Sequence, residues 1–188
     1  MKKSQNFSDK CRCCFDFLSP KKDKLVYKWP LCSVVIPIKP SVDRKSGGHL
    51  ILFPHRHVIK LSDLEPKEAL AVMRASMIIE RAMYEILPSL GIDLVNINIQ
   101  DNGNLNVDEP ENRHFHLHFY GRVRDNKNFS HREFLCLPLR ESDYYRNLIS
   151  FDKRDKEILA NRIKELEASQ KFDFNDRDLS EKIKTWRN

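Results

Sequence analysis

Five short segments of the chain have hydrophobic patterns that are typical of strands. These runs lie at residues 25–27, 32–36, 49–53, 94–100 and 113–120. Pro37 and Pro40 follow the second run, so this strand ends there or lies at an edge, because proline cannot donate to a sheet ladder. The runs at 94–100 and 113–120 both alternate, and we expect them to pair.

Two longer segments have helical periodicity. The clearer one spans residues 62–87, where Ser62 and Glu65 form a capping-box pattern and Pro66 lies in the first turn. Its apolar stripe is expected to lie in the core and consists of Leu70, Met73, Met77, Tyr84 and Leu87. A second helix is expected over residues 151–170, after an irregular and highly charged stretch. Its apolar stripe consists of Ile158, Leu159, Ile163 and Leu166.

The composition is that of a globular domain with an extension. The chain has 188 residues, of which 40% are hydrophobic and 32% charged, too apolar for a wholly disordered protein. No run approaches the ~20 apolar residues of a membrane helix, and residues 1–9 are not typical of a secretory signal. Five cysteines, three of them crowded into residues 11–14, do not form a disulfide framework. We therefore expect a cytoplasmic protein without a membrane partner.

Lysine and arginine outnumber aspartate and glutamate by 33 to 27, which gives a net charge of +6. This excess suits an anionic partner such as a nucleotide, a phosphoester or nucleic acid. Many ordinary soluble proteins carry a similar charge, so the charge alone does not select a ligand.

Three histidines, His114, His116 and His118, occupy every second position of the last predicted strand. Strand alternation places their imidazoles on one face, about 7 Å apart from one to the next, and the apolar residues between them on the core face. Imidazole acts as nucleophile, acid or base near neutral pH, so this row suits phosphoryl chemistry. A His-x-His metal site and the polar face of an ordinary sheet are the alternatives. An ordinary polar face predicts mixed Lys, Thr, Glu and Ser rather than three histidines.

Residues 114–120, His-Phe-His-Leu-His-Phe-Tyr, resemble the motif of the histidine-triad family, His-apolar-His-apolar-His-apolar-apolar. Residues 48–57, Gly-His-Leu-Ile-Leu-Phe-Pro-His-Arg-His, are similar to the Gly-His-apolar strand and Pro-x-x-His segment of that family. The helix, the alternating strand and an Asn-Gly pair at 102–103 follow in the family's order. The resemblance covers residues 11–122.

The resemblance implies an α+β histidine-triad fold, an antiparallel sheet with one long helix, over residues 11–122. Residues 123–188 are then a basic, partly helical C-terminal extension. It also implies a homodimer and a phosphohydrolase or nucleotidyl transferase that acts at the α-phosphate of a nucleotide or nucleotide-like phosphoester. No cofactor is required for this chemistry. A triad-like domain that only binds nucleotides or nucleic acid is the alternative from another class, and release of nucleotides from nucleic-acid 5′ ends is a further enzymatic one.

Site residues follow from the same resemblance. It implies that His116 is the nucleophile that forms a nucleotidyl-histidine intermediate, that His118 contacts the phosphate oxygens, and that His114 orients its neighbour. His57, in the Pro-x-x-His segment, adds a further donor. The residues expected to bind the substrate are Asn102, Ile38 and Asn112.

The sequence departs from the family pattern at two positions. Glu111 stands where nucleotide-hydrolysing members usually have a serine or threonine whose hydroxyl contacts the phosphates or leaving group. Pro37 stands where many members have the aspartate that holds the ribose hydroxyls. These departures motivate the binding-module alternative and predict an unusual substrate.

A single Cys-x-x-Cys pair, Cys11 and Cys14, is compatible with a zinc half-site or with small apolar side chains packed near the sheet. Some bacterial histidine-triad proteins are similar in this respect. Their zinc is held by the two cysteines, the His of Pro-x-x-His and the first triad His. The resemblance therefore implies a structural zinc ligand set of Cys11, Cys14, His57 and His114. The other isolated cysteines, Cys32 and Cys136, are expected in the core.

Overall fold

A five-stranded antiparallel sheet forms the centre of the molecule. The computed structural model describes residues 11, 13–14, 24–102 and 110–173. The strands are β1 (Leu25–Lys28), β2 (Cys32–Val35), β3 (His49–Pro54), β4 (Leu94–Gln100) and β5 (Leu117–Val123). Their order is β1-β2-β3-β5-β4, and every neighbouring pair is antiparallel. The α+β architecture and the pairing of β4 with β5 are confirmed.

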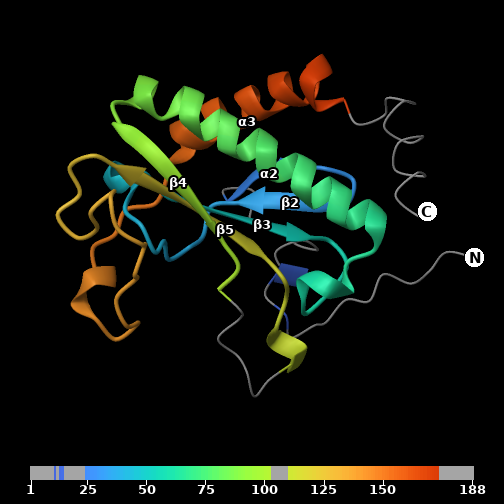
Figure 1. Ribbon diagram of the computed structural model, residues 1–188, viewed down its shortest axis with the longest axis horizontal. Coiled ribbons are helices and arrows are strands. Elements are labelled where there is room, and N and C mark those ends of the chain that lie inside the picture. The colour runs from blue at the N-terminus through green and yellow to red at the C-terminus, as the bar shows by residue number, and fades with distance from the viewer. Residues whose placement is uncertain (1–10, 12, 15–23, 103–109, 174–188) are drawn as a thin grey trace, which may run out of the picture.

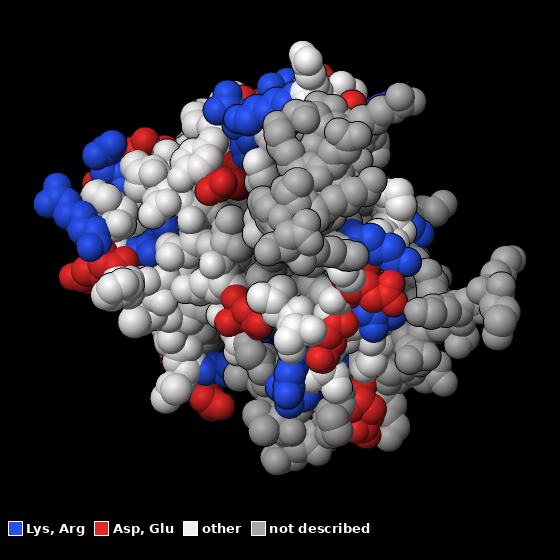
Figure 2. Space-filling view, turned by 45° about the vertical axis from the view of Figure 1, so that its right-hand side comes forward, with Lys and Arg blue, Asp and Glu red and all other residues white. Residues whose placement is uncertain are grey.

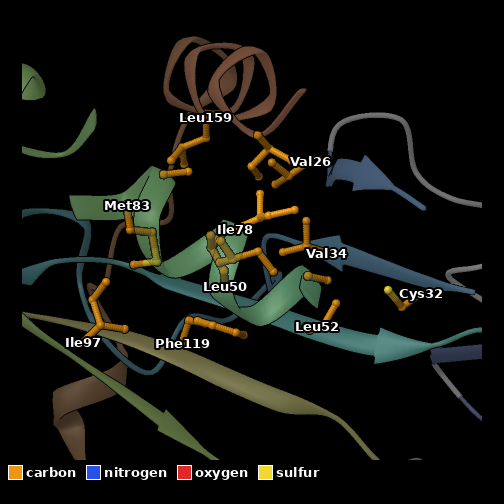
Figure 3. Close-up of a cluster of buried hydrophobic side chains, with 14 of the residues drawn as sticks. Val26, Cys32, Val34, Leu50, Leu52, Ile78, Met83, Ile97, Phe119 and Leu159 are labelled. Atoms are coloured by element: carbon orange, nitrogen blue, oxygen red, sulfur yellow. The ribbon is translucent and has the colours of Figure 1, made fainter. Parts of the chain in front are cut away.

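Two long helices complete the core. Helix α2 (Pro66–Ile86) lies across the sheet, and α3 (Lys153–Glu167) packs against α2 and β1 (Figure 1). In the core, Leu50 and Val34 of the sheet meet Ile78 of α2, and Leu159 joins them from α3 (Figure 3). The short 3₁₀ helices are η1 (Arg44–Ser46), η2 (Leu61–Asp63), η3 (Pro88–Leu90), η4 (Pro110–Asn112), η5 (Asp143–Tyr145) and η6 (Gln170–Phe172). The described residues include no helix long and apolar enough to cross a membrane.

The first helix begins later than the sequence pattern predicts. Residues 61–63 form the separate 3₁₀ helix η2, and α2 begins at Pro66. The capping box joins Glu65 and Glu68, so the predicted pairing of Ser62 with Glu65 is wrong. A proline forces the residue before it out of the helical region, and Glu65 has φ −69° and ψ 152°. The helix therefore cannot extend upstream through this residue.

The buried face of α2 is a different one from the stripe predicted. Leu87 is buried, but the other four residues of that stripe are 37–61% exposed: Leu70, Met73, Met77 and Tyr84. The face that packs on the core consists of Val72, Ala75, Ile78, Ile79, Ala82 and Met83. The helix has two apolar stripes, and the one with two alanines allows close approach to the sheet. The larger side chains are left on an exposed apolar surface.

The segment after β5 packs on the other face of the sheet. Phe119 belongs to the core beneath α2, whereas its neighbour Tyr120 belongs to a second cluster with Val42, Phe129 and Leu135. Neighbouring strand residues point to opposite faces, so this second cluster lies on the face away from α2. Helix α3 then follows from Asp152, whose carboxylate accepts a hydrogen bond from the backbone N–H of Asp155 (2.9 Å). The predicted second helix is confirmed with shorter bounds, and residues 174–188 lie outside the described part.

A close approach at Gly48 predicts that Gly48→Ala destabilises the fold. Gly48 has φ +73°, and a Cβ there would lie 2.0 Å from a ring carbon of the buried Phe151. We expect the free energy of unfolding to fall by about 2–4 kcal/mol, because backbone strain and overpacking add. Chemical denaturation measures this loss.

Gly91→Ala is the matched control for that substitution. Gly91 has a similar φ of +77°, but a Cβ there meets nothing within 4 Å. This variant should lose only about 1 kcal/mol, the part due to the left-handed backbone. Equal losses in the two variants would show that the contact with Phe151 is unimportant.

Candidate functional site

The sheet register brings the two histidine-bearing segments together. On β3 and β5, His49 lies opposite Tyr120, and Ile51 lies opposite His118. On the other side of β5, Gln100 of β4 lies opposite His118. The end of the triad is thus in the middle of the sheet, between two hydrogen-bonded neighbours.

The triad segment is a regular strand only from Leu117 onward, but the predicted alternation extends upstream of it, since Phe115, Leu117 and Phe119 all pack in or against the core. His114 and His116 precede β5, where the backbone N–H of Phe115 donates to Val58 O (2.7 Å). The rings of His116 and His118 pack edge to face with centroids 4.6 Å apart, whereas His114 packs against His57 at 5.3 Å. The triad is therefore divided between two groups of side chains.

His116 has the tautomer that a nucleophile requires. Its Nδ1 lies 2.6 Å from the backbone carbonyl oxygen of His114. A carbonyl only accepts, so Nδ1 carries the proton and Nε2 carries the lone pair. Burial lowers the pKa of His116 and outweighs the opposite effect of the bond to His114. The ring is neutral near pH 7, with Nε2 available for bond formation.

A chain of hydrogen bonds fixes the tautomer of His118. The backbone N–H of Ser41 donates to His49 Nδ1 (3.1 Å), so neutral His49 carries its proton on Nε2. That N–H donates to His118 Nδ1 (2.9 Å), which leaves His118 with a proton on Nε2. Burial keeps the pKa of His49 well below its usual value, and burial together with the charge of His116 lowers the pKa of His118 to about 3. His118 is thus a neutral hydrogen-bond donor.

Two residues that the sequence did not assign to the site, His49 and Tyr120, belong to it. Tyr120 stacks on His118 with the ring planes 7° apart and the centroids 5.3 Å apart. His49 contacts both of these rings. The Gly-His pair at 48–49 was a signal for His49, but no sequence pattern indicated the stacking of Tyr120.

The three expected substrate-binding residues lie in different surroundings. Asn102, just after β4, donates through Nδ2 to the hydroxyl of Tyr120 (2.9 Å), which places it one ring from His118. Asn112 is half-buried in η4, close before the triad in the sequence. Ile38 is 45% exposed in the segment after β2. Asn102 is thus connected to the triad through Tyr120, which stacks on His118.

A second group joins two cysteines to two histidines. Cys11 Sγ lies 3.3 Å from His114 Nδ1, and Cys14 Sγ lies 3.3 Å from His57 Nδ1 and 3.6 Å from His114 Nδ1. The four ligand atoms all lie within 4.8 Å of one another. In a tetrahedral zinc site with usual bond lengths, sulfur and nitrogen ligands are about 3.6 Å apart. The donor set and its spacing fit such a site.

The surroundings of this cluster orient its ligands. His114 Nε2 donates to Pro54 O (2.9 Å), so its Nδ1 presents a lone pair toward the two sulfurs. A hydrogen bond from Cys13 and interactions with His114 lower the pKa of Cys11, which favours the thiolate that binds metal. Arg56, beside His57, donates to Glu68 of α2 through Nη2 (2.6 Å) and Nε (2.9 Å). This ion pair ties the Pro-x-x-His segment to the start of the helix.

Cys32 and Cys136 lie outside the cluster, in different surroundings. Cys32 is buried, as predicted, and burial raises the pKa of its thiol to about 12. Cys136 is exposed in the segment after β5, so its predicted place in the core is wrong. The apolar residues of that segment that pack inward are Phe129 and Leu135.

Comparison with known proteins identifies the fold and the family. The family model of the HIT domain matches residues 19–125. A hypothetical histidine triad nucleotide-binding protein from Sulfolobus tokodaii superposes with a TM-score of 0.57 at 12% identity, over 87% of this chain and 98% of that one. A zinc-bound histidine triad family protein from Mycobacterium smegmatis gives 0.55 at 18% identity, over 86% and 98%. A histidine triad protein from Bradyrhizobium japonicum gives 0.51 at 20% identity, over 77% and 91%.

No match was found among curated proteins. The structural neighbours are too distant in sequence to define more than the fold. The family model, however, covers more than half of the chain and includes both histidine-bearing strands. The chain therefore belongs to the histidine-triad (HIT) family.

Proposed function

We propose that this protein is a nucleotide hydrolase or nucleotidyl transferase that forms a covalent intermediate on His116. The observation that supports this most directly is the hydrogen bond from His116 Nδ1 to the carbonyl of His114 (2.6 Å). It holds the ring in the tautomer whose Nε2 lone pair is free. Members of the family generally hydrolyse or transfer nucleotides, which agrees with this chemistry.

Each of the two steps makes one bond and breaks one. In the first, the lone pair of His116 Nε2 attacks the α-phosphorus, and the bond to the leaving group breaks with its electron pair on the leaving atom. In the second, water attacks the phosphorus, the N–P bond breaks, and the pair returns to Nε2. The water releases one proton, and the product is a nucleoside monophosphate. Transfer replaces water with another nucleophile.

His118 supports both steps as a donor. Its protonated Nε2, set by the bonds from Ser41 and His49, is a fixed dipole next to the nucleophile. Fixed donors stabilise the charge that develops on phosphoryl oxygens, and they need no reorganisation during the reaction. His118 is thus the group that we expect to contact the phosphate.

A panel of substrates tests this proposal. Diadenosine polyphosphates, adenosine phosphoramidates and adenylylated nucleic acid are offered to the protein, and release of adenosine monophosphate is measured. Turnover of at least one class is expected. Tight binding without turnover would contradict the enzymatic proposal and favour a binding module. On the face in Figure 2, basic and acidic side chains of the described residues are interspersed, which favours a small substrate over long nucleic acid.

We also propose that the Cys11, Cys14, His57 and His114 cluster holds a structural zinc ion. Four protein ligands would close the coordination shell, so zinc bound there stabilises the fold and has no open position for a reacting group. Binding of both His57 and His114 would leave His116 and His118 as the histidines that carry out the reaction.

A homodimer through α2 and β4 is the third part of this proposal. Strand β4 is at the edge of the sheet, and Ile99 on it is 40% exposed. Ile99 shares its strand face with the buried Ile97, so it lies on the side of the sheet that α2 covers. The exposed stripe of Leu70, Met73, Met77 and Tyr84 lies on α2, and the hydroxyl of Tyr84 donates to Asn96 Oδ1 of β4 (3.3 Å). A second copy would cover both elements together.

We expect glutamate at both Met73 and Met77 to convert the dimer to a monomer. These side chains are 61% and 38% exposed, so the substitutions leave the core intact, but charge in a buried apolar interface is unfavourable. Light scattering at micromolar concentration measures the mass. Ile149→Glu, at an apolar position 58% exposed on another part of the surface, is the control and should remain a dimer. A monomeric wild-type protein would refute the interface.

A further inference from the structure

The segment after β5 lies next to the triad, although it follows the part of the chain that the family model matches. Phe129 and Leu135 pack around the buried Tyr120, with Leu137 and Tyr144 at the edge of the same cluster. The ring of Tyr120 stacks on His118 at 5.3 Å between centroids. The segment therefore packs on the ring that stacks on His118, the proposed donor to the phosphate.

Residues 138–145 of this segment form a loop closed by its own hydrogen bonds. The hydroxyl of Tyr145 donates to Pro138 O (2.7 Å), and the backbone N–H of Ser142 donates to Leu139 O (2.9 Å). Tyr144 donates to Ser41 O (3.1 Å), and Ser41 in turn donates to His49. The loop is thus held at both of its ends and tied to the residue that orients His118.

Arg140 occupies the exposed part of this loop. It follows Leu137 by three residues and precedes Tyr144 by four, and both of these side chains pack in the cluster around Tyr120. Its positive charge acts on three rings. Burial and the interaction with His116 are the two largest causes that lower the pKa of His118, and the charge of Arg140 is the third. The same charge acts to lower the pKa of Tyr120 and Tyr145. Arg140 is thus carried by a loop whose neighbouring side chains pack around Tyr120, the ring that stacks on His118.

The charge of Arg140 is not neutralised by an ion pair. Among the residues that the structure describes, no carboxylate lies within salt-bridge distance of Arg140, whereas Arg44 pairs with Asp155 and Arg56 with Glu68. The segment just before the triad contributes both an acid, Glu111, and a cation, Arg113. An exposed arginine beside a site for anions is a ready partner for phosphate, because its fork of N–H groups matches two phosphate oxygens.

We infer that Arg140 binds a phosphate group beyond the α-phosphate, so that the site prefers nucleoside polyphosphates and dinucleoside polyphosphates over nucleotides with one phosphate. This inference rests on the proposed function for its location, because His116 and His118 are taken to hold the α-phosphate. It assigns a substrate-binding role to the C-terminal extension.

Binding measurements test the inference independently of turnover. Affinities for adenosine triphosphate and adenosine monophosphate are measured by calorimetry without magnesium, for the wild-type protein and for Arg140→Gln. The wild type should bind the triphosphate more tightly. The substitution should weaken triphosphate binding by about 10- to 100-fold, the scale of a lost charge-assisted contact, and leave monophosphate binding unchanged. Arg140→Lys should recover part of the loss.

Arg132→Gln is the matched control, since Arg132 is exposed on the same segment. It should bind both nucleotides as the wild type does. Equal weakening of both nucleotides by Arg140→Gln would indicate a structural role and overturn the inference, as would a wild type that binds the two equally. A protein that prefers the triphosphate through Arg140 but hydrolyses nothing would refute the proposed function and support the inference.

Discussion

Replacing His116 with alanine is expected to reduce turnover of a nucleotide substrate by at least about 10³-fold, the scale for removal of a covalent catalyst. His118 and His49 would remain as donors, but neither replaces the lost lone pair. His118 Nε2 carries a proton, and His49 Nδ1 accepts from Ser41. Steady-state rates of monophosphate release measure the loss.

The covalent intermediate provides a second readout of the same prediction. Wild-type protein denatured at alkaline pH during turnover should gain the mass of one nucleotidyl group, because the N–P bond is labile in acid but persists in alkali, and His116→Ala should not. His131→Ala is a suitable control, because His131 lies outside the triad segment in the sequence and its Nδ1 donates a hydrogen bond to Arg124 O just after β5 (3.1 Å). Turnover retained by a correctly folded His116→Ala variant would remove His116 as the nucleophile.

The histidine pattern predicted the alternation of side chains better than it predicted where the strand begins. Alternation placed Phe115 and Phe119 in the core correctly, because burial of apolar side chains depends on the local pattern. It did not predict that the regular strand begins only at Leu117. That outcome depends on contacts of Phe115 with Val58 and of His114 with Pro54, which are far away in the sequence.

The exposed stripe of α2 shows a related limit. Apolar periodicity identified the helix, but two faces of it are apolar, and the pattern favoured the one with the larger side chains. Which face is buried depends on how closely the helix approaches the sheet, where Ala75 and Ala82 leave room. The contacts of Tyr120 and Tyr144 near the triad were likewise unpredictable, because they join a loop to strands through tertiary packing alone.

His114 links the cysteine–histidine cluster to the group that contains His116 and His118. Its side chain faces the cysteines through Nδ1 and Pro54 O through Nε2, while its backbone carbonyl accepts the proton of His116 Nδ1. The residue that fixes the tautomer of the proposed nucleophile is thus a member of the proposed zinc site. Loss of metal would release the side chain of His114 and, with it, the orientation of His116.

Removal of the zinc ligands is expected to have the largest effect on stability. Protein purified without added metal should contain about one zinc ion per chain, since binding energy at a structural site is also folding energy. Cys11→Ala and Cys14→Ala should each abolish this zinc. If the metal is present at about 1,000 times its dissociation constant, its loss removes about 4 kcal/mol of stability. For a chain of this size, that corresponds to a fall in Tm of about 8–16 °C.

Cys136→Ala separates loss of a ligand from loss of a thiol, because Cys136 is exposed and lies outside the cluster. This variant should keep its zinc and its Tm. Elemental analysis and thermal denaturation of the three variants decide the question together. A zinc content below about 0.2 per chain, with Cys11→Ala as stable as the wild type, would refute a structural ion. Cys11 and Cys14 would then be small buried side chains, and His57 and His114 would again be candidates for contact with the phosphate.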